Sequence, residues 1–228
     1  MRLGLPTGMH MMLKAKVGGA NVMRAYSPMT DDTTLGHVDL MVKVYFAGVH
    51  PKFPEGGKMS QHLESMKIGD TIDVKGPLGE FIYQGMGSFN LNGKPGTCSK
   101  ITLIAGGTGL TPCYQVLAAV LRETQDSTQV RLLYANRSPE DILMREQLDS
   151  LAKSHPDRFQ LWYTVDVVPE GAAWEYDVGF VTTEMMEAHL FPAAADTIAL
   201  MCGPPPMTES AKAKLQGLGY KEKDLVTL

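Results

Sequence analysis

Long hydrophobic runs are missing from this sequence, and cysteine is scarce. No apolar run approaches the ~18–20 residues of a membrane-spanning helix, and the opening residues MRLGLPTG contain no apolar signal-peptide core. Only three cysteines occur, Cys98, Cys113 and Cys202, and their unrelated spacings argue against a disulfide framework or a zinc site. The sequence therefore predicts a cytoplasmic protein without a membrane segment in this chain.

Positive charge is not concentrated anywhere in the chain. Residues 1–97 carry 10 Lys and Arg against 8 Asp and Glu, whereas residues 98–228 carry 11 against 17. Neither half has the basic character of a nucleic-acid-binding protein, so no nucleic-acid partner is predicted. The six histidines show no metal-ligand spacing, and no bound metal or haem is predicted within the chain.

The first part of the chain has the rhythm of short strands. Strand-like runs separated by Gly, Pro and Asp turns favour a small antiparallel barrel or sandwich. The expected strands cover residues 9–16, 21–27, 37–46, 70–76 and 80–84, with one helix at 60–66. Residues 87–100, rich in Gly, Asn and Ser, are interpreted as a linker. We therefore expect two domains, residues 1–97 and 98–228.

The second part alternates apolar strands with helices. The expected strands are 101–105, 130–135, 161–165 and 197–202, and the expected helices lie near 112–123, 140–153, 183–189 and 207–217. This alternation predicts a parallel sheet covered on both faces. Ligands of such sheets bind at the carboxyl ends of the strands, so GGTGLTP and CGPPPM are expected to line the same crevice.

A glycine-rich turn, AGGTGLTP at 105–112, follows the first of these strands. Gly107 and Gly109 would let the backbone approach a pyrophosphate at a helix N-terminus, with Pro112 at the first helical position. The alternative is a tight strand-to-helix turn without a ligand. A Walker Lys-Ser/Thr ending is missing, which argues against nucleotide hydrolysis.

The triple proline of MCGPPPM must end the strand before it, because proline has no N–H for a sheet ladder. We expect the strand to stop at Cys202 or Gly203. Either the rigid loop presents Cys202 to a ligand, or the prolines only terminate a strand.

Two stretches of the first part could also bind a nucleotide. In MRAYSP, Arg24 and Tyr26 share one strand face, offering a guanidinium for a phosphate and a ring for a flat aromatic group. In GGKMSQHL, two glycines lead into a helix whose N-terminus suits an anion. The alternatives are an exposed strand arginine and a helix cap at Ser60.

Taken together, RAYSP, LMVKVYF, HPKFPEGGKMSQHLESMKIGDTIDVKGPLGE, AGGTGLTP, YANRSPEDILMREQLD, WYTVD and MCGPPPM resemble the FAD/NADH module of cytochrome-b5 reductases and assimilatory nitrate reductases. Ala25 favours the nitrate reductase branch, where RAY is typical. The resemblance implies an antiparallel flavin-binding β-barrel followed by a Rossmann-like parallel α/β domain. Family members have one or two strands ahead of LGLPTGMH, so the barrel is expected to be N-terminally incomplete and the chain a fragment. It also implies an aromatic residue near the flavin at the C-terminus, where this chain ends in LVTL.

The resemblance implies two cofactor sites. Its FAD-binding positions are Arg24, Ala25, Tyr26, Ser27, Val42, Lys43, Val44, Tyr45, Phe46, Phe53, Gly57, Lys58, Met59, Ser60 and Gln61. Its nucleotide-domain positions are Gly106, Gly107, Thr108, Gly109, Thr111, Pro112, Asn136, Asp166, Cys202, Gly203, Pro204, Pro205 and Met207.

Particular roles follow from the resemblance for the catalytic positions Cys202, Thr111 and Ser27. Ser27 would reach the N5 edge of the flavin, and Thr111 would touch the flavin from the nucleotide domain. The sulfur of Cys202 would contact the nicotinamide and position it rather than attack it.

Further roles concern binding. Arg24 would hold the flavin pyrophosphate, Tyr26 would pack on the isoalloxazine and Lys58 would face the bound NADH. Asp166 would accept hydrogen bonds from the adenosine ribose and repel a 2′-phosphate, which favours NADH over NADPH. Alternatively, Asp166 is an ordinary turn residue.

The expected activity is hydride transfer from NADH to FAD, followed by single-electron transfer to a b-type haem. The haem would belong to a sister domain of a longer polypeptide, homodimeric in some cases, or to a separate cytochrome b5. A stand-alone NADH–cytochrome-b5 reductase is the first alternative. A flavin-free NAD-dependent dehydrogenase and a non-catalytic interaction domain are remoter ones.

Overall fold

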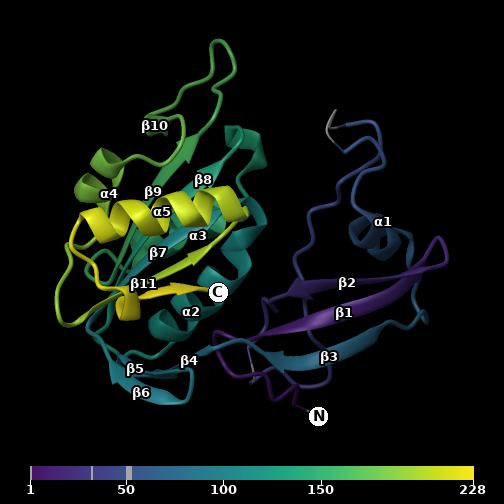
Figure 1. Ribbon diagram of the computed structural model, residues 1–228, viewed down its shortest axis with the longest axis horizontal. Helices are drawn as coiled ribbons and strands as arrows, with labels where there is room; N and C mark the ends of the chain where they lie inside the picture. Colours follow the sequence, from purple (N-terminus) through teal and green to yellow (C-terminus); the bar gives the residue numbers. More distant parts are fainter. Residues whose placement is uncertain (1, 32, 50–52) are drawn as a thin grey trace.

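The computed structural model describes residues 2–31, 33–49 and 53–228. Figure 1 shows two lobes. The front lobe consists of one antiparallel sheet and α1, and the α/β lobe consists of a larger sheet with helices around it.

The front lobe is a three-stranded antiparallel sheet of order β2-β1-β3. Its strands are β1 (His10–Val17), β2 (Ala20–Tyr26) and β3 (Asp73–Leu78). The helix α1 (Lys58–Ser65) covers one face by burying Met59 against Leu13 and Val22. Of the five strands predicted for the first part of the chain, those at 9–16, 21–27 and 70–76 are thus confirmed to within three residues, as is the helix.

The predicted strand at 37–46 is wrong, because this segment joins no sheet in the structure. Its polar and apolar residues alternate as in a strand, but its backbone groups have other partners. The Tyr45 amide donates to Ser60 Oγ at 3.1 Å, and the Gly57 amide donates to the Tyr45 carbonyl at 2.8 Å. The segment therefore runs past the N-terminus of α1 instead of pairing with a strand.

The predicted linker at 87–100 is also wrong. Strands β4 (Phe81–Gly85), β5 (Ser88–Leu91) and β6 (Lys94–Thr97) form a second antiparallel sheet. Asn92 and Gly93, both with positive φ, make the turn between β5 and β6, and Asn-Gly is a strong hairpin signal. Phe81 and Tyr83 of this sheet belong to the core of the α/β lobe.

The α/β lobe contains a six-stranded sheet, of order β10-β9-β8-β7-β11-β12, with all strands parallel. The strands are β7 (Lys100–Gly106), β8 (Gln129–Asn136), β9 (Phe159–Val165), β10 (Asp177–Val178), β11 (Thr197–Cys202) and β12 (Leu225–Thr227). The four predicted strands are confirmed. The short edge strands β10 and β12 were not predicted, because two or three residues carry no readable periodicity.

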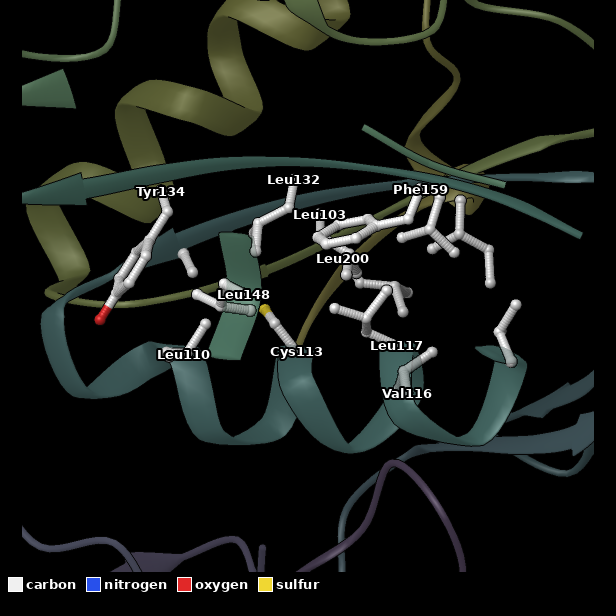
Figure 2. Close-up of a cluster of buried hydrophobic side chains, with 14 of the residues drawn as sticks. Leu103, Leu110, Cys113, Val116, Leu117, Leu132, Tyr134, Leu148, Phe159 and Leu200 are labelled. Atoms are coloured by element: carbon white, nitrogen blue, oxygen red, sulfur yellow. The ribbon is translucent and has the colours of Figure 1, made fainter. Parts of the chain in front are cut away.

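Helices cover both faces of this sheet. The helices α2 (Leu110–Arg122) and α3 (Arg145–Ser154) pack on one face, and α4 (Thr183–His189) and α5 (Pro205–Gly217) pack on the other. Figure 2 shows Cys113 and Leu117 on the side of α2 that faces Leu132 and Leu200. Helix α3 begins later than predicted, since Met144 has a positive φ and a short 3₁₀ turn, η2 (Pro139–Asp141), comes first.

The predicted fold class, antiparallel strands followed by a parallel α/β sheet, is confirmed. Within the described residues the antiparallel strands form two three-stranded sheets. Among the helices of the described ranges, none is both long enough and apolar enough to cross a bilayer.

Candidate functional site

The carboxyl ends of β7 and β11 bring together the two motifs that the sequence analysis singled out. A Cβ added to Gly109 would lie 2.2 Å from the Cys202 carbonyl oxygen. A Cβ added to Gly106 would lie 2.5 Å from the Met207 sulfur. The expectation that GGTGLTP and CGPPPM share one crevice is therefore confirmed.

The glycine-rich turn differs in detail from the prediction. Residues Gly107–Gly109 form a short 3₁₀ turn, and α2 begins at Leu110, so Pro112 is its third residue and not its first. Gly107 has a positive φ of 53°, which only glycine adopts at low cost. Gly109 is required by the close approach of the β11 backbone, a reason that the sequence did not reveal.

The triple proline both ends a strand and starts a helix. Strand β11 ends at Cys202 as predicted, Pro204 is the N-cap of α5, and Pro205 is its first residue. Proline suits a first helical turn, since the N–H groups there have no intrahelical acceptor. The prolines therefore fix the entry of α5 beside the ends of β7 and β11.

One cleft, the sheet-end cleft, has a volume of about 530 Å³. It is lined by Lys43, Gly106, Gly107, Ala135, Asn136, Arg137, Asp166, Gly179, Phe180, Val181, Pro204, Pro206, Met207, Ser210, Ala211 and Lys214. The lining contains the cationic side chains of Lys43, Arg137 and Lys214 and one carboxylate, that of Asp166. This excess of positive charge suits an anionic ligand.

Two details of the sheet-end cleft fit a dinucleotide. The side-chain amide nitrogen of Asn136 is buried and has no hydrogen-bond partner of normal geometry among the described residues, and such groups usually have one. Phe180 leaves 83% of its surface exposed, although it lines the cleft. The uncovered ring suits the aromatic part of a nucleotide, and the Asn136 amide, which also interacts with the Tyr134 hydroxyl, adds a polar group to the cleft wall.

The second cleft, the interlobe cleft, has a volume of about 220 Å³. It is lined by Arg24, Ala25, Tyr26, Met41, Val42, Lys43, Tyr45, Gly57, Met59, Ser60, Thr108 and Thr111. The last two side chains come from the α/β lobe and the others from the front lobe. Lys43 lines both clefts, so the clefts meet at this residue.

The interlobe cleft has the features that a flavin nucleotide needs. Arg24 offers a guanidinium, and Tyr26 offers an aromatic ring. Burial raises the pKa of the Tyr26 phenol above its ordinary value, so the hydroxyl is neutral. Gly57 is the N-cap of α1, and a Cβ there would lie 2.5 Å from Ser60 Oγ. The backbone can therefore approach a phosphate at the helix N-terminus, where the first N–H groups lack intrahelical partners.

Several predicted cofactor positions lie outside the lining of both clefts. These residues are Ser27, Val44, Phe46, Phe53, Lys58, Gln61, Gly109, Pro112, Cys202, Gly203 and Pro205. Gln61 instead holds the loop before α1, because its amide donates to the Glu55 carbonyl at 2.8 Å. Ser27 is buried directly after β2. Their roles toward a cofactor stay predictions.

The environments of Cys202 and Thr111 bear on their predicted roles. Burial raises the pKa of Cys202 to about 11, so its thiol is neutral at physiological pH. A neutral thiol is a poor nucleophile, which agrees with positioning rather than attack. The Thr111 hydroxyl donates to the Thr108 carbonyl at 3.2 Å, and this bond orients the side chain at the edge of the interlobe cleft.

Sequence reasoning missed part of each lining. The missed residues are Met41, Ala135, Arg137, Gly179, Phe180, Val181, Pro206, Ser210, Ala211 and Lys214. Arg137 follows Asn136 directly, so the end of β8 was a usable signal. Phe180 and Lys214 had none, since they reach the cleft through the loop after β10 and through α5.

This fold with two joined clefts defines a class, the oxidoreductases that bind a flavin and a nicotinamide dinucleotide. Family models agree with both halves. Residues 1–83 match the oxidoreductase FAD-binding domain, and residues 103–213 match the oxidoreductase NAD-binding domain. FAD and NAD are therefore the cofactors of the two halves.

Individual relatives narrow the class. The chain is 50% identical to a nitrate reductase [NADH] of Volvox carteri, over 99% of this chain and 26% of that protein. It is 48% identical to NADH-cytochrome b5 reductase 2 of Xenopus tropicalis, over 96% of this chain and 74% of that protein. The crystal structure of the cytochrome b5 reductase domain of Ulva prolifera nitrate reductase superposes with a TM-score of 0.96 at 48% identity, covering 100% of this chain and 87% of that one.

The chain belongs to the cytochrome b5 reductase family of FAD- and NAD-binding oxidoreductases. It spans 26% of the length of the Volvox nitrate reductase. The two family models leave residues 84–102 between them. The predicted domain boundary after residue 97 lies in this interval and stays a prediction.

Proposed function

We propose that this chain is the electron-entry module of a nitrate reductase, taking a hydride from NADH and delivering single electrons to a b-type haem. The observation that carries the proposal is the meeting of the two clefts at Lys43, with Thr108 and Thr111 reaching from the α/β lobe into the interlobe cleft. Hydride transfer requires the two reacting rings at roughly 3–3.5 Å, and only adjoining sites permit this. When bound, FAD supplies the conversion of a two-electron hydride into one-electron steps.

The residues of the chain bind and orient in this proposal. Arg24 and the N-terminus of α1 hold the flavin phosphates, and Tyr26 packs against the ring system. Asn136 and the cationic side chains of the sheet-end cleft hold the dinucleotide. Cys202 fixes the end of β11 beside the glycine-rich turn, and Asp166 disfavours a 2′-phosphate.

The acceptor is proposed from the relatives, because nitrate reductases and NADH-cytochrome b5 reductases are both matched over almost the whole chain. A haem domain of the same polypeptide is the first candidate, and a separate cytochrome b5 is the second. We also propose a cytoplasmic location, because Cys98, Cys113 and Cys202 are all free thiols, which agrees with a reducing compartment.

The proposal is tested with purified chain supplied with FAD. We expect a yellow flavoprotein whose absorbance near the flavin maximum bleaches on addition of NADH, with ferricyanide then reduced catalytically. Separate assays with cytochrome b5 and with a nitrate reductase haem domain rank the two acceptors. A protein that oxidises NADH without retaining FAD would instead be a flavin-free dehydrogenase. A protein that neither retains FAD nor oxidises NADH would contradict the proposal.

A further inference from the structure

The ammonium group of Lys43 is held at the junction of the two clefts by a carboxylate of the other lobe. Its Nζ lies 2.5 Å from Asp141 Oδ1, and the two side chains are 31% and 29% exposed. Of the ion pairs within the described ranges, this one and the pair Asp31–Arg122 join the front lobe to the α/β lobe.

Asp141 contacts Lys43 from outside the two clefts, since Lys43 lines both clefts and Asp141 lines neither. The carboxylate is itself anchored by the turn η2. The Asp141 amide donates to the Ser138 carbonyl at 3.1 Å, and Ser138 Oγ donates to Asp141 Oδ2 at 3.3 Å. Because this turn starts three residues after β8 ends, the carboxylate has a fixed place relative to the sheet.

We propose that Asp141 is a positioning residue, which fixes the Lys43 ammonium where the dinucleotide in the sheet-end cleft meets the flavin in the interlobe cleft. This inference rests on the proposed function. A lysine side chain has four flexible carbons and three ammonium donors. One donor engages Asp141, and the other two remain for anionic groups in the clefts. The carboxylate thus removes side-chain freedom that dinucleotide binding would otherwise have to remove.

The test is calorimetric titration of the FAD-loaded protein with NAD⁺, which does not depend on turnover. Asp141→Asn keeps the size of the side chain and its bond with Ser138 but loses the charge that fixes Lys43. We expect the Kd for NAD⁺ to rise about three- to tenfold. An effect of this size is expected because the ion pair is partly exposed and also restricts the Lys43 side chain before the dinucleotide binds. Asp141→Glu, which keeps the charge, should recover most of the affinity.

Two further variants make the assignment specific. If Asp141 acts through Lys43, then Asp141→Asn should have no further effect in a Lys43→Met background. Asp31→Asn is the matched control, because it weakens the other interlobe ion pair and keeps the amide bond from Thr33. Its Kd for NAD⁺ should equal that of the parent.

Several results would overturn the inference. An unchanged or lowered Kd in Asp141→Asn would show that the carboxylate is neutral toward the dinucleotide or repels it. An equal rise in the Lys43→Met background would separate Asp141 from Lys43, and an equal rise in Asp31→Asn would indicate general loosening of the lobes. A parent protein that retains FAD and binds NAD⁺ but shows these results leaves the proposed function standing, whereas a parent that binds neither contradicts that function itself.

Discussion

The two lobes of this molecule build their clefts by different means. In the α/β lobe, six of the seven residues of β7 are buried, and large clusters fill both faces of the sheet. In the front lobe, β3 has no buried residue, and the core consists of Leu13, Val22 and Met59. The α/β lobe is therefore a packed scaffold, while the front lobe has little apolar burial to hold it.

This difference determines what each site depends on. At the end of the parallel sheet, backbone atoms approach each other so closely that no side chain fits between them, as at Gly109 and Cys202. In the interlobe cleft, by contrast, side chains such as Arg24 and Tyr26 extend from an edge strand. Substitutions should thus damage folding in the α/β lobe and cofactor retention in the front lobe.

The largest effect is expected for Gly109→Ala. The new methyl group would lie 2.2 Å from the Cys202 carbonyl oxygen, and backbone cannot move aside as a flexible side chain can. We expect a loss of about 3 kcal/mol in the free energy of unfolding, measured by urea titration with tryptophan fluorescence.

Gly217→Ala is the matched control, because a Cβ there meets no atom within 4 Å and the residue ends α5. It should be neutral or raise the stability by about 0.5–1 kcal/mol. Equal stabilities of the two variants would contradict a rigid contact between the glycine-rich turn and β11.

The second effect concerns the front lobe. Arg24→Ala should leave the fold intact but weaken FAD binding by about 1.5–3 kcal/mol, since a charge-assisted phosphate contact is lost. The Kd for FAD, measured by flavin fluorescence, should rise about ten- to hundredfold. Lys16→Ala removes a positive charge from an exposed position of β1 outside both clefts and should not change it. Equal flavin retention in all three proteins would remove Arg24 from the site.

Sequence reasoning succeeded where burial is two-sided. A strand covered on both faces, such as β7 or β11, is a continuous apolar run and is easily recognised. The strand prediction for 37–46 failed because this segment passes the N-terminus of α1 and supplies Met41, Val42, Lys43 and Tyr45 to the interlobe cleft without joining a sheet. The hairpin at Asn92–Gly93 was overlooked inside a polar stretch.

The candidate sites show the same limit. Motif residues next to a strand end, such as Gly106, Gly107 and Asn136, line the sheet-end cleft, while their contacts with a cofactor stay predictions. Phe180 and Lys214 were missed, because tertiary packing alone brings their elements to the cleft. The ion pair of Lys43 and Asp141 joins residues 98 positions apart, and no local pattern encodes it.

The third effect concerns Cys202, at the end of β11, and tests whether this residue only positions the nicotinamide. Cys202→Ser should bind NAD⁺ about as well as the parent yet reduce the flavin ~10-fold more slowly, which is ~1.4 kcal/mol in the barrier. Stopped-flow bleaching by saturating NADH measures this step alone. Cys202→Ala should retain measurable reduction, and abolished reduction in both variants with FAD bound would instead indicate covalent or proton-transfer chemistry.

The pH dependence of Cys202 sharpens the same question. Burial raises its pKa from 9.0 to about 11, so flavin reduction should show no thiol titration between about pH 7 and 9. The folded-state pKa lies above the unfolded value. The thiol therefore adds stability below about pH 9, and this contribution is lost as the pH rises through about 11. If the rate of flavin reduction instead rises with an apparent pKa near 8, and this pH dependence is absent in Cys202→Ala, then Cys202 acts as a thiolate and the positioning role is rejected.

The smallest effect is expected at Asp166, where the cleft of the α/β lobe depends on an exposed side chain, as the front lobe does. Asp166 follows β9 directly and lines the sheet-end cleft, so its carboxylate can repel a 2′-phosphate while accepting bonds from ribose hydroxyls. Because the group is exposed, screening limits the repulsion, and Asp166→Ser should narrow the NADH-to-NADPH ratio of kcat/KM by about three- to tenfold. Asp157→Ser, at an exposed position outside the cleft, should leave the ratio unchanged.

Arg137 and Lys214 line the same cleft as Asp166 and would attract the added phosphate once the carboxylate is gone. The change in the ratio should therefore come from faster use of NADPH more than from slower use of NADH. An unchanged ratio, or a loss confined to NADH, would show that dinucleotide selection lies with those cations and not with Asp166.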